Sequence, residues 1–328
     1  MDILISEELD SPAIQRLAAK YKVLRQPALW KSPAELKTAI VGVRAIMVRN
    51  QTQLTAEILA AASQLLAIGR VGVGLDNIDV PAASKSGVVV IAPLDANAAS
   101  VAELTLAFAL ALARKIPQAD RSTKAGGWDR KGCTGTELDG KTFAICGFGR
   151  IGRRVAVLAR AFGMKPLVFD PFVKQNSPSL AETGSSWVAT LEEALAVADF
   201  ITTHSPLTEE TRRMFKARTF ALMKRGAFFI NTSRGGVVDE AALLEALRSG
   251  QLGGAALDVR EKEPPGERTS LEQMDNVILA PHIGAFTTES QTRTFEAVAG
   301  DIDRILSGQP ALNFVNMASP TREARIMK

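Results

Sequence analysis

Residues 141–160 read KTFAICGFGRIGRRVAVLAR, and this stretch decides the fold of the region around it. Its first six residues are mostly apolar, which predicts a buried strand, and apolar positions recur at helical spacing after residue 150. Between strand and helix lies the pattern G-x-G-x-x-G, formed by Gly147, Gly149 and Gly152. The stretch therefore predicts a strand, a tight glycine turn and a helix in direct succession.

This context makes the glycine pattern the fingerprint of a Rossmann dinucleotide-binding site. Gly147 permits the tight turn, Gly149 lets the backbone approach a pyrophosphate, and Gly152 allows close packing of helix on strand. The helix start, with Arg150 and Ile151, offers backbone N–H groups to phosphates. A glycine-rich turn without a ligand is the alternative interpretation.

The next apolar run, PLVFD at 166–170, ends on Asp170, which follows Gly152 by 18 residues. A carboxylate at this spacing accepts hydrogen bonds from a ribose diol and repels a 2′-phosphate. The sequence therefore predicts NAD as the cofactor in preference to NADP.

Strands and helices alternate on both sides of this stretch, which predicts an α/β fold with parallel sheets covered on both faces. Two alternating arrays are separated by the glycine-rich loop 124–140, and we expect two domains with a cleft between them. Long helices at 98–114 and 287–306 are interpreted as the crossovers. The expected domains are therefore a discontinuous one, 1–97 with 288–328, and a central one, 98–287.

Composition limits the function classes. The chain has 328 residues, 46% hydrophobic and 23% charged, and its net charge of +4 is spread along the sequence. Scattered Lys and Arg residues argue against a nucleic-acid partner, and short, interrupted apolar runs argue against a membrane span. With no basic, apolar leader at the N-terminus and only Cys133 and Cys146, we expect a cytoplasmic protein. No cluster of residues predicts a metal site.

Eight stretches together resemble the D-isomer-specific 2-hydroxyacid dehydrogenase family. The resemblance implies a Rossmann-type NAD-binding domain inserted into a flavodoxin-like substrate domain. It also implies a small anionic D-2-hydroxy or 2-keto acid as substrate, and a homodimer formed through the NAD-binding domain. The stretches are VRNQT at 48–52, RVGVGLDNIDV at 70–80, NAASVAEL at 97–104, GKTFAICGFGRIG at 140–152, HSPLTEETRRMF at 204–215, INTSRGGVVDE at 230–240, AALDVREKEPP at 255–265 and APHIG at 280–284.

The family's catalytic positions fall on Arg234, Glu263 and His282, and each follows a predicted strand. His282 is one of only two histidines, so candidates for a near-neutral acid or base are few. A carboxylate such as Glu263 favours the protonated imidazole and orients its ring. The Arg234 guanidinium suits a substrate carboxylate. Taken singly, each residue is as consistent with an ordinary surface position.

The resemblance also places residues around the ligands. The glycine-rich loop with Val73 and Gly74 would bind the substrate carboxylate through backbone N–H groups. Arg49, Asn50 and Asn97 match positions beside the substrate, together with Arg234 and His282. Residues expected to line NAD, beyond the glycine turn and Asp170, are His204, Ser205, Pro206, Thr211, Thr232, Ser233 and Asp258, with a mainly packing or backbone role for His204.

The side chain of the substrate stays open at this point. The segment GGWDRKGCTGTEL at 126–138 resembles that of phosphoglycerate dehydrogenases, where a basic residue such as Arg130 or Lys131 reaches a neighbour's active site. Gln53, however, stands where those enzymes often carry a basic residue. Glyoxylate or hydroxypyruvate reduction is the main competitor. Other interpretations are an NAD-sensing corepressor and a formate or phosphite dehydrogenase on the same scaffold.

The helix at 98–114 is apolar on more than one face, whereas a surface helix of an isolated domain shows one stripe. It is therefore our candidate for the dimer interface. The apolar positions are Ala98, Val101, Ala102, Leu104, Leu106, Phe108, Ala109, Leu110 and Leu112.

Overall fold

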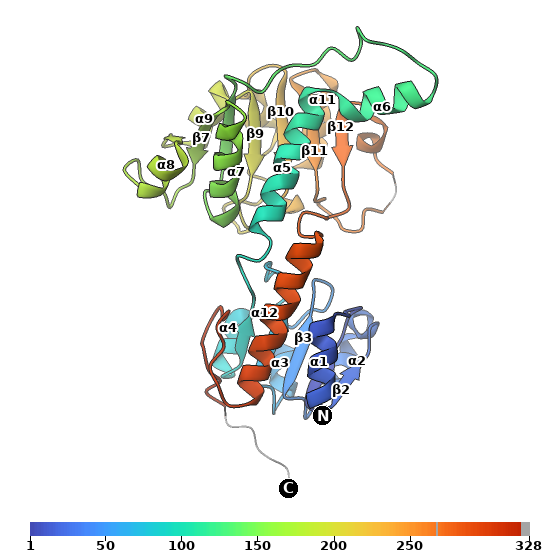
Figure 1. The fold of residues 1–328 in the computed structure, drawn as a ribbon, viewed down its shortest axis with the longest axis vertical. Coiled ribbons are helices and arrows are strands. Elements are labelled where there is room, and N and C mark those ends of the chain that lie inside the picture. The colour runs from blue at the N-terminus through green and yellow to red at the C-terminus, as the bar shows by residue number, and fades with distance from the viewer. Residues whose placement is uncertain (267, 323–328) are drawn as a thin grey trace. The chain divides into compact units, whose positions relative to one another are not determined.

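The computed structural model describes residues 1–266 and 268–322. The chain divides into two compact units, residues 1–97 with 286–328 and residues 98–285. The sequence placed the second boundary two residues later, at 287/288. Each unit is an α/β body with its own parallel sheet (Figure 1).

Unit 1 has a five-stranded sheet in the order β2-β1-β3-β4-β5, which is the flavodoxin order expected from the sequence. Alternate residues of each strand face opposite sides, so both faces carry apolar side chains: Ile3 and Ile5 pack with α1 and α12, and Leu4 packs with α2 to α4. Its elements are β1 (Ile3–Ile5), α1 (Pro12–Lys20), β2 (Val23–Arg25), η1 (Leu29–Lys31), α2 (Pro33–Ala39), β3 (Ala45–Val48), α3 (Ala56–Ala61), β4 (Ala67–Arg70), α4 (Val80–Lys85), β5 (Val89–Ile91) and α12 (Thr288–Leu306).

The long C-terminal helix α12 returns to this unit and lies against β4. Gly69 makes the close approach possible, because a Cβ at that position would lie 2.7 Å from side-chain atoms of both Val298 and Ile302. The helix begins where the sequence predicted, with the Thr287 hydroxyl accepting a hydrogen bond from Ser290 N.

Unit 2 has a seven-stranded sheet in the order β12-β11-β10-β9-β6-β7-β8. From β6 the chain adds β7 and β8 toward one edge of the sheet. It then crosses to the other side of β6 and adds β9 to β12 toward the opposite edge, as in the Rossmann order. Its elements are α5 (Ala98–Ala113), α6 (Ile116–Lys124), β6 (Thr142–Cys146), α7 (Arg150–Ala161), β7 (Lys165–Phe169), α8 (Pro178–Thr183), β8 (Ser186–Trp187), α9 (Leu191–Val197), β9 (Phe200–Thr203), α10 (Ala217–Ala221), β10 (Ala227–Asn231), η2 (Gly235–Val237), α11 (Glu240–Arg248), β11 (Leu252–Leu257), η3 (Ser270–Gln273) and β12 (Val277–Leu279).

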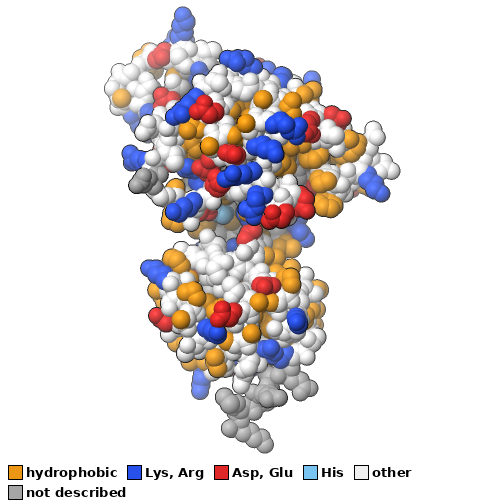
Figure 2. Space-filling model, turned by 180° about the vertical axis from the view of Figure 1, so that it is seen from behind, with side chains coloured by type: hydrophobic (Ala, Val, Ile, Leu, Met, Phe, Trp, Pro, Cys, Tyr) orange, Lys and Arg blue, Asp and Glu red, His pale blue; other side chains and the backbone are white. Residues whose placement is uncertain are grey.

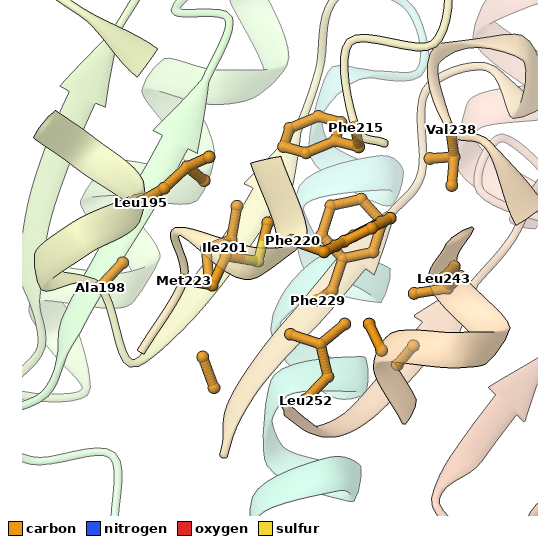
Figure 3. Close-up of a cluster of buried hydrophobic side chains, with 14 of the residues drawn as sticks. Leu195, Ala198, Ile201, Phe215, Phe220, Met223, Phe229, Val238, Leu243 and Leu252 are labelled. Carbon is orange, nitrogen blue, oxygen red and sulfur yellow. The ribbon is translucent and has the colours of Figure 1, made fainter. Parts of the chain in front are cut away.

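Helices cover both faces of this sheet. α5, α7 and α8 bury one face, and α9, α10 and α11 bury the other. On the second face Phe215, Phe220 and Phe229 meet, with ring centroids 4.8 to 6.4 Å apart, and Leu195, Met223 and Leu252 pack around them (Figure 3). This aromatic cluster anchors the strands that carry the loops of the candidate site.

Three elements differ from the sequence prediction. The segment after α5 contains a further helix, α6, which starts after Lys115 turns the backbone to φ +51°. A helix, α8, and a two-residue edge strand, β8, precede α9. The side chains of Thr190 and Glu193 form a capping box at the start of α9.

The apolar faces of α5 are largely covered inside unit 2. Seven of the nine apolar positions proposed for a dimer interface are buried within the single chain, and only Leu104 and Leu110 are partly exposed. α7 and the strands β10 to β12 provide the cover. The breadth of the apolar surface on α5 is therefore explained by packing within the unit.

Candidate active site

The glycine turn between β6 and α7 has the geometry that its spacing predicted. Gly147 has φ +98°, and a Cβ there would lie 2.9 Å from the carbonyl carbon of His204. A Cβ on Gly152 would lie 2.2 Å from Gly147 O, so only glycine allows α7 to start this close to β6. A Cβ on Gly149 would meet no atom within 4 Å. The backbone at Gly149 therefore borders open space that a phosphate can enter.

Asp170, at the end of β7, lies beside this turn. Its Oδ2 accepts a hydrogen bond from Phe148 N at 2.7 Å, and its Oδ1 accepts one from Phe172 N at 2.8 Å. Each carboxylate oxygen keeps a second lone pair for a ribose hydroxyl. Gly149 is the N-cap of α7 and has no side chain to close that helix end. Arg150 and Ile151 form its first turn, so the residues present fit a dinucleotide.

Two buried polar atoms next to the turn have no hydrogen-bond partner among the described residues, namely Thr203 Oγ1 and His204 Nδ1. The other ring nitrogen of His204 lies 3.2 Å from Thr202 Oγ1. Burial lowers the pKa of His204 to about 3, so its ring is neutral at physiological pH. This histidine has no charge to offer and suits the packing role expected from the sequence.

The remaining residues predicted to line the cofactor form ordered turns. Thr211 Oγ1 donates to Pro206 O at 2.6 Å and accepts from Thr208 N, which folds the segment after β9. Ser205 Oγ reaches back to Cys146 O at 3.4 Å.

The turn after β10 is ordered by Asn231, which the sequence analysis did not select. Its Oδ1 accepts from Ser233 N and Ser233 Oγ, and its Nδ2 donates to Arg234 O at 2.9 Å. Thr232 Oγ1 lies 3.0 Å from Thr105 Oγ1 of α5. A polar residue at the end of a buried strand was the signal that could have identified Asn231.

His282 and Glu263 form the most distinctive pair of unit 2. Nδ1 of His282 lies 2.7 Å from Oε2 of Glu263, while Oε1 of Glu263 accepts a hydrogen bond from Arg260 N at 3.0 Å. The His282 side chain is 44% exposed and that of Glu263 33%, so the pair is open to a ligand. Because Nδ1 is hydrogen-bonded to the carboxylate, Nε2 is the nitrogen that can exchange a proton with a ligand.

The backbone of His282 is held in an uncommon conformation, with φ +56°. Asp258, which is 1% exposed, fixes it: Asp258 O accepts from His282 N at 2.8 Å, and the two carboxylate oxygens accept from Ile283 N and Gly284 N. Burial raises the pKa of Asp258, and the two backbone donors partly oppose that rise. Asp258 therefore shapes the loop that presents His282.

Arg234 is the N-cap residue of η2 and is partly buried, with Nη1 donating to Ser233 O at 2.8 Å. Its charge acts on Glu263. Partial burial raises the pKa of Glu263, but the hydrogen bond and charge of His282, the bond from Arg260 N and the charge of Arg234 together bring the pKa below its usual value. The three predicted catalytic residues thus belong to one electrostatic cluster.

The other predicted substrate residues all lie in unit 1, near the carboxyl ends of β3, β4 and β5. The loop after β4 wraps the Arg70 guanidinium, which donates to Val71 O at 2.6 Å and Gly74 O at 2.8 Å. Within the described chain, the N–H groups of Val73 and Gly74 make no hydrogen bond. Such a loop is suited to bind an anion. Asn97 is buried, and its Oδ1 has no partner among these residues.

The loop after β3 is clamped by Glu7, another residue that the sequence analysis missed. Glu7 is 4% exposed and accepts from the backbone N–H groups of Arg49, Gln51 and Thr52. The Arg49 side chain stacks on the Phe286 ring, 4.3 Å from its centroid, and donates to Gln291 Oε1 at 2.6 Å. The Asn50 side chain, by contrast, is exposed.

Comparison with known proteins bears directly on this arrangement. A family model described as "D-isomer specific 2-hydroxyacid dehydrogenase, NAD binding domain" matches residues 106–284. The chain belongs to this family. The match covers the glycine turn, Asp170 and the cluster of Arg234, Glu263 and His282, and it identifies unit 2 as the family's NAD-binding domain.

Relatives with names agree with this. A D-3-phosphoglycerate dehydrogenase of Synechocystis sp. is 44% identical over 319 residues, 97% of this chain and 56% of that protein. One of Methanocaldococcus jannaschii is 44% identical over 322 residues, 98% of this chain and 60% of that protein. The chain thus spans less than two thirds of the length of these relatives.

Solved structures share the whole fold. The TT0316 protein from Thermus thermophilus has a TM-score of 0.88 at 33% identity, covering 96% of this chain and 100% of that one. A D-lactate dehydrogenase from Aquifex aeolicus, solved with NAD and lactic acid, has a TM-score of 0.86 at 31% identity, covering 97% and 100%. NAD is accordingly the cofactor for this dehydrogenase fold.

Surface features of the chain complete the description. Lys and Arg side chains lie among Asp and Glu on the face seen in Figure 2, without separation by sign. In residues 1–266 and 268–322 no helix is long and apolar enough to cross a membrane. The same residues contain no group of three or more His, Cys, Asp or Glu side chains arranged to hold a metal ion.

Proposed function

We propose that this chain is an NAD-dependent dehydrogenase that interconverts a small D-2-hydroxy acid and its 2-keto acid. The observation that carries the proposal is the His282–Glu263 pair, 2.7 Å apart, in the electrostatic cluster that also contains Arg234. This cluster belongs to the same unit as the glycine turn that fits a dinucleotide. An acid–base group, a cation for a carboxylate and a dinucleotide site are the parts that such a reaction needs.

The proposed mechanism uses the side chains of Arg234, His282 and Glu263. Arg234 binds the carboxylate of the keto acid and polarises its carbonyl group. His282, held through Nδ1 by Glu263, donates its Nε2 proton to the keto oxygen. A reduced nicotinamide bound at the dinucleotide site would supply the hydride that the carbonyl carbon accepts. In the reverse direction neutral His282 accepts the hydroxyl proton. Glu263 stabilises the imidazolium form and fixes the ring.

The proposed cofactor contacts follow the same expectations. Backbone N–H groups at Gly149, Arg150 and Ile151 bind the pyrophosphate, and Asp170 binds the adenosine ribose. Residues proposed to border the rest of NAD are His204, Pro206, Thr211, Thr232, Ser233 and Asp258.

D-3-phosphoglycerate is the substrate that we propose, because the relatives described above carry that name. Its carboxylate and phosphate both require anion-binding groups, and unit 1 offers the amides of Val73 and Gly74 near the ends of strands that also carry Arg49 and Arg70. Asn50 and Asn97 complete the proposed substrate side. The comparisons give no support to the corepressor interpretation or to formate or phosphite oxidation.

A substrate panel tests this proposal. The purified chain with NAD is offered D-3-phosphoglycerate, D-glycerate, D-lactate, formate and phosphite, and NADH formation is followed by absorbance. We expect the highest kcat/KM with D-3-phosphoglycerate. Activity only with formate or phosphite, or none with any 2-hydroxy acid, would overturn the proposed function; a preference for D-glycerate or D-lactate would overturn only the substrate.

We also propose a homodimer formed through unit 2. Ile116 on α6 and Trp128 in the following loop are 53% and 81% exposed. A cavity of about 230 Å³ lies between α5, α6 and the edge of the sheet, and its lining includes Leu112, Pro117 and Ile278. Light scattering at micromolar concentration tests assembly. A dimer mass that falls to the monomer mass in Ile116→Asp is expected, and a monomeric unmodified protein would contradict the proposal.

A cytoplasmic location remains part of the proposal. Both cysteines are free, and burial raises the pKa of Cys146 to about 12, which keeps it an inert thiol. Fractionation of the source cells, followed by immunodetection, tests the location.

A further inference from the structure

An ion network centred on the buried Arg260 side chain adjoins the loop that carries Glu263. The Arg260 side chain is 8% exposed. Its Nε and Nη2 bind the two carboxylate oxygens of Glu240 at 3.0 and 2.9 Å, and its Nη1 binds Glu272 Oε1 at 2.7 Å. Glu240 opens α11 and Glu272 lies in η3. One guanidinium therefore ties the segment after β11 to two separate elements.

The same network fastens the backbone that carries Glu263. Glu240 Oε1 also accepts a hydrogen bond from Glu261 N at 2.7 Å, and Arg260 N donates to Glu263 Oε1 at 3.0 Å. Two successive contacts, from Glu240 to the Arg260 side chain and from Arg260 N to Glu263, thus join Glu240 to the carboxylate that contacts His282. A change in the position of residue 260 has to move Glu263.

Arg260 also borders the turn of Arg234. A Cβ added to Gly235 would lie 1.8 Å from Arg260 O, so the two backbones are in direct contact. The loop of Glu263 and the loop of Arg234 are consequently packed as one body. The charged groups that act on Glu263 in this body are His282, Arg234 and Asp258.

Two members of the network, Arg260 and Glu272, are stabilised in their charged forms. The hydrogen bond to Glu240 raises the pKa of Arg260. Burial raises the pKa of Glu272, but the bonds from Arg260 and Thr269 outweigh it and bring that pKa to about 2. The planar guanidinium matches two carboxylates at once, whereas the single ammonium of lysine does not.

We propose that Arg260 is a positioning residue, whose paired contacts to Glu240 and Glu272 hold Glu263 in the orientation that engages His282. This rests on the proposed function, in which the His282–Glu263 pair exchanges the substrate proton. The alternative is that the contacts of Arg260 with Glu240 and Glu272 only stabilise the fold of unit 2. The two differ in what happens at His282, since a purely stabilising network leaves the imidazole unchanged while the fold persists.

The test uses Arg260→Lys, which keeps the charge and loses the paired geometry. The chain has two histidines, and buried His204 stays neutral at assay pH, so an imidazole NMR signal that moves in that range reports His282. We expect Arg260→Lys to move the midpoint of that signal to lower pH, in the direction also expected for Glu263→Gln, and to lower kcat about tenfold. In the Glu263→Gln background it should cause no further shift of the midpoint.

Arg248→Lys is the matched control, because exposed Arg248 on α11 binds Glu245 and Ser270 of η3 without touching the Glu263 loop. If Arg260→Lys fails to fold, Glu272→Gln keeps the Glu240 pair and should give a smaller shift in the same direction. An unchanged midpoint in a folded variant, or an equal shift with and without Glu263, would overturn the proposal. Absence of keto-acid reduction in the unmodified chain, with the midpoint still coupled, would overturn the proposed function instead.

Discussion

Nδ1 of His282 lies 2.7 Å from Oε2 of Glu263, although the two residues are 19 positions apart and follow different strands. One nitrogen of the ring is therefore committed to a carboxylate, and the other is left for chemistry.

Replacing His282 should remove the proton donor. His282→Ala is expected to lower kcat for keto-acid reduction about 100-fold, which is typical for loss of a positioned general acid. NADH affinity, measured by fluorescence titration, should change little, because the glycine turn is untouched. Near-normal kcat in the variant would assign the proton to water or to another residue.

Replacing Glu263 should shift the pH profile. The charge of His282 helps to lower the pKa of Glu263, and by reciprocity the carboxylate stabilises the imidazolium. Reduction requires the protonated ring, and an amide stabilises it less. In Glu263→Gln the limb of the kcat–pH profile that falls toward high pH should therefore move to lower pH. A shift to higher pH, or none, would show that Glu263 does not stabilise the protonated ring.

Asp170 should determine the cofactor. A carboxylate beside the ribose repels a 2′-phosphate, so the unmodified chain should use NADH with a far higher kcat/KM than NADPH. Asp170→Ser should reduce this preference, while Glu182→Ser, which changes an exposed carboxylate on α8, should leave it intact. Equal kinetics with both cofactors in the unmodified chain would refute the assignment.

Glu7 should govern the substrate loop of unit 1. Its two carboxylate oxygens accept hydrogen bonds from three backbone N–H groups, whereas a glutamine side chain has only one oxygen that can accept them. Glu7→Gln should raise KM for the keto acid and lower the free energy of unfolding by about 1–3 kcal/mol. Exposed Glu8 gives the control, because Glu8→Gln should change neither quantity. An unchanged KM in Glu7→Gln would separate the clamp from substrate binding.

Local patterns were enough to predict most of the fold. The glycine turn and the alternating strands depend on residues close in sequence, and the structure confirms both. α6 was missed because the chain resumes a helix directly after the left-handed Lys115, and β8 because it has two residues at a sheet edge.

The residues of the candidate site could be predicted only where they fall in a recognisable sequence motif. Glu7, Asn231 and Arg260 are buried polar residues at or shortly after the ends of strands, but their roles depend on the positions of their partners in space. Glu7 meets residues 42 to 45 positions away, and Arg260 meets Glu240 from 20 positions away. The apolar faces of α5 were visible in the sequence, but the sequence did not show what covers them. In the structure, other elements of unit 2 cover them.

The central claim is that this chain reduces a 2-keto acid to the D-hydroxy acid with a proton from His282. The most direct measurement incubates it with NADH and 3-phosphohydroxypyruvate, follows NADH loss and resolves the enantiomers of the product by chiral chromatography. We expect D-3-phosphoglycerate in amounts equal to the NADH consumed, and about 100-fold slower formation by His282→Ala. Formation of the L enantiomer, or no NADH loss with this or any other 2-keto acid, would contradict it.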